Sequence, residues 1–173
     1  MDSPLDAAFD ALVELARDLL GGTAALVSLV DDSRQFFKAQ VGLGEPWASA
    51  RQTPLSHSFC QHVVNESGPF LVEDAHTDTR VQGNRAIAEL GVIAYAGVPL
   101  VDEGEHSLGA LCVIDGQPRV WTEKEVRTLK TLAKAVMAEV HVRQSLLQRQ
   151  QEAHERERLL QSLQTTQIGR AHV

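Results

Sequence analysis

Two short apolar runs in the middle of the chain, joined by a charged loop, most constrain how this sequence can fold. Residues 94–100 include the segment YAGVPL, and residues 108–114 read LGALCVI. Both runs are short and mostly apolar, which is typical of buried strands, and the loop between them holds Gly104 among acidic residues, where the chain can reverse. The sequence therefore predicts an antiparallel hairpin at the centre of a sheet, and neither run carries a catalytic motif.

Three further runs predict strands that extend this sheet. Residues 24–30 form an apolar run typical of a buried strand, and residues 35–41 follow after a turn of Asp and Ser side chains. Residues 70–72 predict a brief strand between Gly-Pro and a polar connection. Residues 42–54 contain several Gly and Pro breakers, so we expect an irregular loop that folds over one face and covers a ligand there.

Helical patterns separate these strands. We expect an amphipathic helix over residues 5–19 after Ser3-Pro4, a short helix that Ser56 or Ser58 caps and that ends near Asn65, and another short helix over residues 81–90. Strands that alternate with short helices around antiparallel neighbours indicate an α+β fold.

A long helix is predicted at the C-terminal end. Thr122 supplies an N-cap hydroxyl, and the acidic residues that follow it suit the positive end of a helix dipole. The apolar positions that follow have a three-four spacing, as expected for a helix that packs on the domain or on a second copy: Val126, Leu129, Ala133, Val136 and Val140. Beyond Arg143 this stripe weakens, and Leu146, Ala153 and Leu160 define a shifted one.

Composition excludes several classes of partner. The formal net charge is −7, and basic residues gather only in the C-terminal helix, where Glu residues alternate with them, so we expect no nucleic-acid binding. No apolar run approaches the roughly 20 residues of a membrane helix, and the N-terminus lacks a secretory pattern, so we expect a cytoplasmic protein without a membrane segment. The two cysteines lie far apart without CxxC spacing, which indicates neither a disulfide framework nor a metal site.

The ordered set of motifs resembles the GAF domain family. The segments LVSLVD from Leu26, QFFK from Gln35, SFC from Ser58, YAGVPL from Tyr95 and LGALCVID from Leu108 are similar to a bacterial signalling subgroup, in the same order. The resemblance covers about residues 5–140. It implies a central antiparallel sheet of five to six strands with helices on its faces, followed by the long C-terminal helix.

The same resemblance implies a domain organisation. We expect a sensory domain over residues 1–140 and a helical, coiled-coil-like connector over residues 141–167. The last six residues, 168–173, look like the translation of a common sequencing adapter, so we expect them to be non-native and an output domain to be missing.

The function implied is that of a regulatory sensory module without enzymatic activity. The resemblance implies that such modules bind a small molecule or dimerise. They then pass the resulting signal through the C-terminal helix to a histidine kinase, diguanylate cyclase or phosphatase unit. We therefore expect an unidentified small ligand and a homodimer, and the sequence leaves the cofactor unknown. The resemblance implies that the ligand lies between the sheet and the short helices, near Phe59, Cys60, Asp74, Asn84, Tyr95 and Gly97.

Each of these positions also has a purely structural interpretation. Tyr95 can anchor the core, Asp74 can cap a turn, and Gly97 can shape the end of a strand. Bilin, cyclic-nucleotide and haem binding are disfavoured, because the motifs for the first two are absent or fragmentary and a histidine for haem has no supporting pattern.

Two other functions remain open. Cys60 begins a predicted helix, where the dipole favours a thiolate, so it could serve a redox sensor or reductase; it could equally be a buried apolar residue, and Cys112 is expected in the core. His57 is the better placed candidate base, with a surface or capping histidine as the alternative. The third possibility is a structural dimerisation module that binds no ligand.

Overall fold

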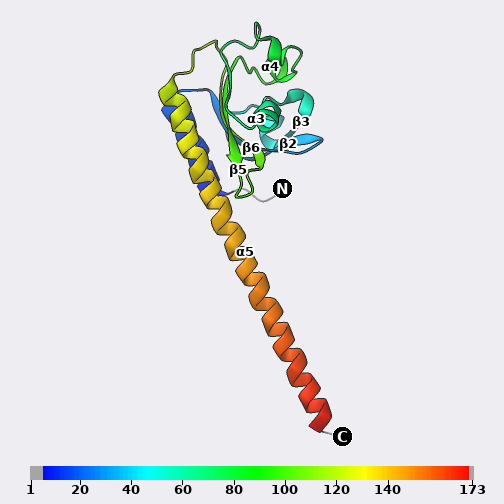
Figure 1. Cartoon of the computed structure of the whole chain (residues 1–173). Coiled ribbons are helices and arrows are strands. Elements are labelled where there is room, and N and C mark those ends of the chain that lie inside the picture. The colour runs from blue at the N-terminus through cyan, green and yellow to red at the C-terminus, as the bar shows by residue number, and fades with distance from the viewer. Residues whose placement is uncertain (1–5, 172–173) are drawn as a thin grey trace. The chain divides into compact units, whose positions relative to one another are not determined.

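A computed structural model describes residues 6–171 of the chain (Figure 1). The chain divides into two units after Met137, and each is described by itself below. The elements, in order, are α1 (Ala7–Leu20), β1 (Ala24–Val30), β2 (Arg34–Val41), α2 (Trp47–Ala50), β3 (Gln52–Pro54), the 3-10 helix η1 (Leu55–His57), α3 (Cys60–Glu66), β4 (Phe70–Val72), the 3-10 helix η2 (Thr79–Val81), α4 (Ala86–Glu89), β5 (Ala94–Val101), β6 (Ser107–Asp115) and α5 (Glu123–Ala171). The expected helix start at Ser3-Pro4 and the last two residues of the adapter-like tail lie outside the described residues.

The first unit is built on one antiparallel sheet of six strands. Its strand order is β3-β2-β1-β6-β5-β4, so β1 and β6 lie at the centre. β5 and β6 form the predicted hairpin, with Ala94 opposite Asp115 at one end and Val101 opposite Ser107 at the other. The predicted α+β fold, with a six-stranded antiparallel sheet, helices and a long C-terminal helix, is confirmed.

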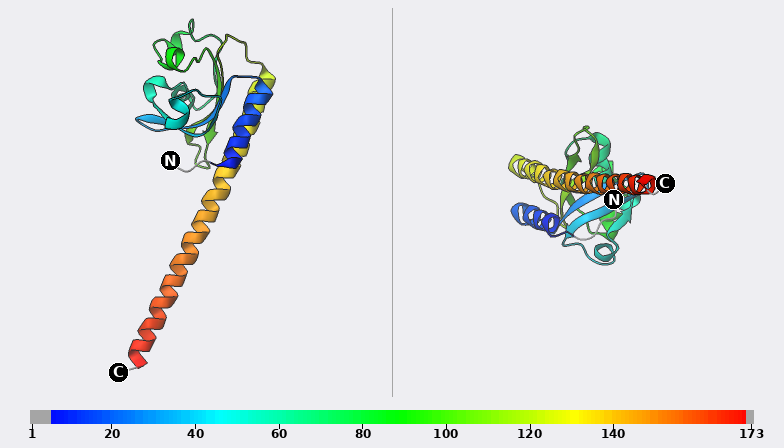
Figure 2. Two further views of the ribbon diagram at one scale, coloured as in Figure 1. Left: turned by 180° about the vertical axis from the view of Figure 1, so that it is seen from behind. Right: turned by 90° about the horizontal axis from the view of Figure 1, so that it is seen from below.

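Helices cover both faces of the sheet. Figure 2 shows α1 and the first turns of α5 on one face, while α3 and α4 lie on the other. α1 buries an apolar stripe of residues near helical spacing, namely Phe9, Val13, Ala16 and Leu20. Its ends are well capped, because the Asp6 carboxylate accepts a hydrogen bond from the N–H of Ala8, and Gly21 adopts the left-handed conformation (φ +70°) that ends the helix.

The face opposite α1 carries the larger aromatic side chains. Phe37, Phe59, Phe70 and Tyr95 belong to one buried cluster there, together with both cysteines. The Ser58 hydroxyl accepts a hydrogen bond from the N–H of Gln61 at 3.1 Å, so Ser58 caps the first turn of α3, as one of the two serines was predicted to do.

α5 begins as the sequence predicts. The Thr122 hydroxyl accepts from the N–H of Glu125 at 3.2 Å, and the Glu125 carboxylate accepts from the N–H of Thr122 at 2.9 Å, which is a reciprocal capping box. Up to Met137, α5 packs an apolar face on the rest of the first unit. The buried residues of this face are Leu129, Leu132, Ala133, Val136 and Met137.

The second unit, from Ala138 onward, is the remainder of this helix. Most of its apolar side chains are exposed to solvent, among them Val142, Leu146, Leu160 and Leu163. Among the described helices, none combines the length and apolar character needed to cross a membrane.

Two local predictions differ from the structure. Residues 42–54 are more ordered than predicted, because they include the short helix α2 and the edge strand β3, which pairs with β2. Pro54 is tolerated there because an edge strand can lack one donor. Residues 81–90 do not form one helix, since Gly83 adopts a left-handed conformation (φ +79°) and only α4 is α-helical.

Candidate functional site: a cavity between the sheet and helices α3 and α4

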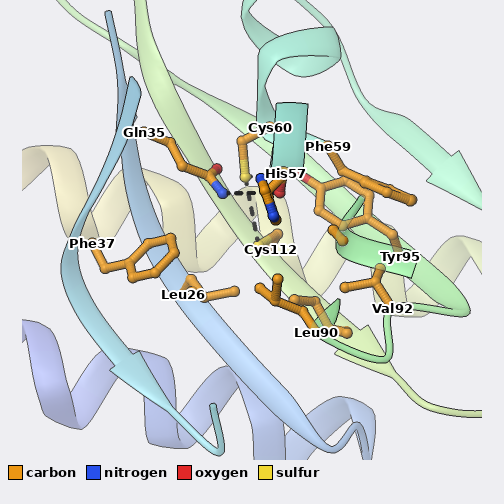
Figure 3. Close-up of a pocket in the computed structure, with 12 residues that line it drawn as sticks. Leu26, Gln35, Phe37, His57, Phe59, Cys60, Leu90, Val92, Tyr95 and Cys112 are labelled. Carbon is orange, nitrogen blue, oxygen red and sulfur yellow. Dashed lines mark hydrogen bonds between the residues drawn. The ribbon is translucent and has the colours of Figure 1, made fainter. Parts of the chain in front are cut away.

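A small cavity lies between the sheet and the helices on the face opposite α1 (Figure 3). Its volume is about 20 Å³, which corresponds to roughly one or two water-sized molecules. The lining residues are Leu26, Gln35, Phe37, His57, Phe59, Cys60, Ala86, Leu90, Val92, Tyr95, Cys112 and Ile114. The site is therefore a small, partly enclosed and mostly apolar space with a few polar groups, a lining typical of small-molecule pockets.

The alternation of side chains along each strand explains how the sheet forms one wall of the cavity. Leu26, Tyr95 and Cys112 come from β1, β5 and β6, and each points to the same face because alternate residues of a strand share a face. Phe59 and Cys60, at the start of α3, form the opposite wall, while α4 and the segment after it close the remaining side.

Two thiols and a phenol meet inside this space. Cys60 Sγ lies 3.9 Å from Cys112 Sγ, and the Tyr95 hydroxyl donates to Cys60 Sγ at 3.2 Å. Both cysteines are free thiols and both are buried, which confirms Cys112 as a core residue. The predicted alternative for Cys60, a buried small side chain, is also what the structure shows.

The two thiols differ in their environment. The thiol of Cys112, and then the Tyr95 hydroxyl, donate to a Cys60 thiolate and lower the pKa of Cys60, although burial opposes this. Burial raises the pKa of Cys112 well above its usual range. Burial and the neighbouring thiols also raise the pKa of Tyr95, so its hydroxyl remains a donor. The Tyr95 hydroxyl, which donates to Cys60 Sγ, is therefore the neighbour that favours a thiolate at Cys60.

Tyr95 is held in place by close packing. Its ring lies 5.3 Å from the Phe59 ring and 6.2 Å from the Phe70 ring. Gly97, two residues along the same strand, lies directly beneath it: a Cβ at Gly97 would come within 2.7 Å of the ring carbons. Gly97 thus makes room for Tyr95 and does not itself line the cavity.

A buried polar network, which the sequence analysis missed, borders the cavity. The hydroxyls of Ser28 and Ser58 both donate to Gln35 Oε1, at 3.1 and 2.9 Å. Gln35 Nε2 donates to Thr53 Oγ1 at 2.7 Å and to the carbonyl of His57 at 3.3 Å. The Gln35 amide is therefore engaged at both ends, and its role is to join β1, β2, β3 and the start of α3. Ser28 within an apolar strand was the available sequence signal.

The ring nitrogens of His57 contact groups other than the Cys60 thiol. The His57 side chain is only 4% exposed, which overturns the expectation of a surface or capping histidine. Nδ1 lies 2.9 Å from the Ser56 hydroxyl and Nε2 lies 2.6 Å from Glu89 Oε2. Both ring nitrogens are thus committed to groups other than the thiol, and the Glu89 contact joins η1 to the end of α4.

The other two predicted ligand residues have structural partners. Asn84 Nδ2 donates to the carbonyl of Ser58 at 2.9 Å, and its Oδ1 accepts from the N–H of Ala86 at 2.9 Å. The Asp74 carboxylate accepts from the N–H of His76, so it caps a turn. Of the six predicted positions, the cavity brings together Phe59, Cys60 and Tyr95. Asn84 joins the start of α4 to Ser58, and Asp74 lies outside the lining.

A metal centre finds no support in this part of the chain. Among residues 6–171, no three or more His, Cys, Asp or Glu side chains gather in an arrangement that could hold a metal ion. The titratable groups that line the cavity are the two thiols, the Tyr95 hydroxyl and the His57 imidazole.

The chain is similar to known proteins both in sequence and in fold. A cyclic di-GMP phosphodiesterase from Pseudomonas aeruginosa is 35% identical over 147 residues, which is 84% of this chain and 24% of that protein. The chain therefore spans about a quarter of this curated relative.

Solved structures show the same fold at lower identity. A domain of a protein described as a two-component sensor histidine kinase from Sinorhizobium meliloti 1021 is 20% identical, with a TM-score of 0.69 over 86% of this chain and 99% of that one. The GAF domain of a phosphoenolpyruvate-protein phosphotransferase from Coxiella burnetii is also 20% identical, with a TM-score of 0.67 over 83% and 86% of the two chains. The GAF domain family profile matches residues 4–140. The chain belongs to the GAF domain family.

Proposed function

We propose that this chain is the regulatory sensory module of a bacterial signal-transduction protein and that it binds a small molecule in the cavity between the sheet and α3 and α4. The observation that carries the proposal is the cavity itself, which is apolar apart from a few oriented polar groups and is closed by a short helix. GAF domains are generally regulatory parts of multidomain signalling proteins, which supports the same role here.

Opening of α4 would admit the ligand. At about 20 Å³ the closed cavity is too small for a metabolite, so binding requires movement of the side that carries Leu90 and Val92. α4 spans only Ala86–Glu89, and a small set of polar contacts from Asn84, Arg85 and Glu89 joins this region to Ser56, His57 and Ser58. Such a short lid can move without unfolding the sheet. The ligand is expected to be largely apolar or aromatic, with a group that pairs with the Tyr95 hydroxyl.

A thermal-shift screen with matched variants tests this proposal. Ala86 lines the cavity and is 1% exposed, whereas Ala88, on the same helix, is exposed to solvent. A library of small aromatic and aliphatic metabolites should contain a ligand that, at about 100 times its Kd, raises the Tm of the wild type by roughly 5–10 °C. Ala88→Leu should keep this shift and Ala86→Leu should lose it. Equal shifts in both variants would place the ligand elsewhere.

The helix of the second unit is proposed to carry the signal within a homodimer. An isolated helix with apolar side chains exposed along its length gains stability when a second copy covers them, and Leu146, Ala153 and Leu160 recur at heptad spacing. α1 adds exposed Leu15 and Leu19, at 44% and 57%. A ligand would act by binding two arrangements of these paired helices unequally.

The output unit is proposed to be a histidine kinase, diguanylate cyclase or phosphatase domain beyond this chain. The Pseudomonas relative, whose name describes a cyclic di-GMP phosphodiesterase, supports an output of the nucleotide-signalling kind. The proposal places the module in the cytoplasm, where free thiols such as Cys60 and Cys112 remain reduced.

A second candidate is a structural dimerisation module that binds no ligand. The small volume of the closed cavity favours it, because a space of about 20 Å³ is close to that of an ordinary packing defect. Failure of every ligand in the screen, together with a stable dimer, would favour this function over sensing.

A further inference from the structure

We propose that Cys60 and Cys112 form a peroxide-reactive dithiol that closes to an intramolecular disulfide inside the cavity. The inference goes beyond the proposed ligand binding, because the chemistry requires only the two thiols and an oxidant small enough to reach them. It makes the cavity a site of covalent modification.

The geometry brings the two sulfur atoms close together from distant parts of the chain (Figure 3). Cys60 is the first residue of α3 and Cys112 lies in β6, and their Sγ atoms are 3.9 Å apart. A disulfide bond is about 2.05 Å long, so the sulfurs need to approach by about 1.9 Å. α3 packs directly on β6, and the chain contains no other cysteine that could compete.

The cavity suits a very small oxidant. Its volume of about 20 Å³ has room for roughly one or two water-sized molecules, and both cysteines belong to its lining. A hydroperoxide with a bulky organic group would meet the apolar wall that Leu26, Phe37 and Leu90 form. Hydrogen peroxide is therefore the oxidant that the closed cavity accommodates.

The surroundings assign different roles to the two thiols. The Tyr95 hydroxyl donates to Cys60 Sγ at 3.2 Å, and the Cys112 thiol lies ready to donate to the same sulfur once Cys60 loses its proton. These donors lower the pKa of Cys60, whereas burial raises the pKa of Cys112. Because the thiolate is the nucleophile and the Tyr95 hydroxyl donates to the sulfur of Cys60, we assign the attack on the oxidant to Cys60 and the resolving step to Cys112.

The reaction balances with hydrogen peroxide as the oxidant. The Cys60 thiolate attacks one peroxide oxygen, the O–O bond breaks, and a sulfenic acid forms while hydroxide leaves. Cys112 then attacks the Cys60 sulfur, the S–O bond breaks and the S–S bond forms. The protons released by the two thiols convert both leaving oxygens to water. The cysteines lose two electrons in total, and the peroxide gains them.

Peptide mapping of the full chain tests the inference. The reduced, folded wild type is treated with hydrogen peroxide, alkylated, and digested with trypsin without reduction. Trypsin releases Cys60 within residues 52–80 and Cys112 within residues 86–119. We expect these two peptides to be joined by a disulfide, in a chain that still migrates as a monomer on a non-reducing denaturing gel.

Variants distinguish the two roles. Cys112→Ser should stop at a Cys60 sulfenic acid, which dimedone traps, whereas Cys60→Ser should leave Cys112 unmodified at the same dose. Tyr95→Phe, which keeps the ring and removes one donor, should slow disulfide formation by about 2- to 10-fold, as expected for one lost hydrogen bond. Circular dichroism of each variant before treatment verifies that it is folded.

The wild-type measurement alone can overturn the inference. If the folded protein yields both peptides separately alkylated after peroxide, or a link only between two chains, the dithiol is not a peroxide site. That outcome leaves the ligand-binding proposal standing, because the thermal-shift screen does not depend on oxidation.

Discussion

At the scale of single residues, Gly97 determines where Tyr95 lies. The Tyr95 ring occupies the space above Gly97, and a Cβ there would come within 2.7 Å of ring carbons that are themselves fully buried. We predict that Gly97→Ala destabilises the fold by about 1–3 kcal/mol, because the ring has no free volume into which to move. Urea unfolding measures the change.

A second glycine provides the control for this prediction. An added Cβ at Gly44 meets no atom within 4 Å, so Gly44→Ala should change the free energy of unfolding by less than about 1 kcal/mol. If both variants unfold at the same urea concentration, then the packing of Tyr95 on Gly97 is looser than described.

Glu89 makes the stability of the first unit depend on pH. The hydrogen bond with His57, and next the contact with Arg85, lower the pKa of Glu89 below its ordinary value of 4.5. A carboxyl group whose pKa falls on folding stabilises the folded state above its unfolded pKa, and this contribution is lost as pH falls through the folded value. The Tm difference between the wild type and Glu89→Gln should therefore be largest near neutral pH and shrink between about pH 5 and pH 3.

Calorimetry across this pH range measures that difference. Glu103→Gln, which changes an exposed carboxylate on the β5–β6 loop, serves as the matched control for the loss of one negative charge. A Glu89→Gln difference that stays constant down to pH 3 would mean that ionisation of Glu89 does not stabilise the folded state.

Part of the site could be predicted from the sequence, and individual residues show why the rest could not. Cys60 and Tyr95 belong to motifs that resemble a known family, so their place could be expected. The network around Gln35 could not, because its partners come from β1, β3 and the segment of His57 and Ser58 before α3, and a single polar residue in a strand does not reveal its neighbours. Asp74 had two interpretations in the sequence, a ligand residue and the cap of a turn, and the structure shows the cap.

At the scale of elements, the start of α5 is a strong local feature. The Thr122 and Glu125 side chains each accept a hydrogen bond from the backbone N–H of the other residue. We predict that Thr122→Ala lowers the free energy of unfolding by about 1 kcal/mol, because one N–H at the helix end loses its acceptor. Chemical denaturation of the full chain measures this loss.

Thr131→Ala is the control within the same helix. Thr131 is exposed in the interior of α5, where alanine is the better helix former, so this change should be neutral or slightly stabilising. Equal destabilisation by the two changes would show that the cap contributes nothing specific.

The prediction of elements succeeded where the pattern was regular. The apolar run 24–30 and the central hairpin were predicted because strands with continuous apolar residues can be recognised locally. The edge strand β3 was missed, since three residues that end in a proline form a strand only because β2 lies beside them. The predicted helix over residues 81–90 is reduced to α4 for a local reason, because Gly83 takes a backbone conformation that interrupts it.

At the scale of the whole molecule, the helix of the second unit should hold two copies together. We predict that Leu160→Asp weakens the proposed homodimer by roughly 10- to 100-fold in Kd, because it places a charge in the apolar seam that recurs at heptad spacing. Gln161→Asp, one position away on the exposed helix, should change Kd far less. Sedimentation equilibrium measures both constants, and equal weakening would exclude this seam.

The central claim is that the cavity beneath α4 holds a small molecule, and native mass spectrometry of protein purified without added ligand tests it most directly. The account predicts that the wild type is a dimer with a defined extra non-covalent mass, that Ala88→Leu retains this mass and that Ala86→Leu loses it. If the wild type carries no extra mass, or if Ala86→Leu carries the same mass as the wild type, the claim is wrong.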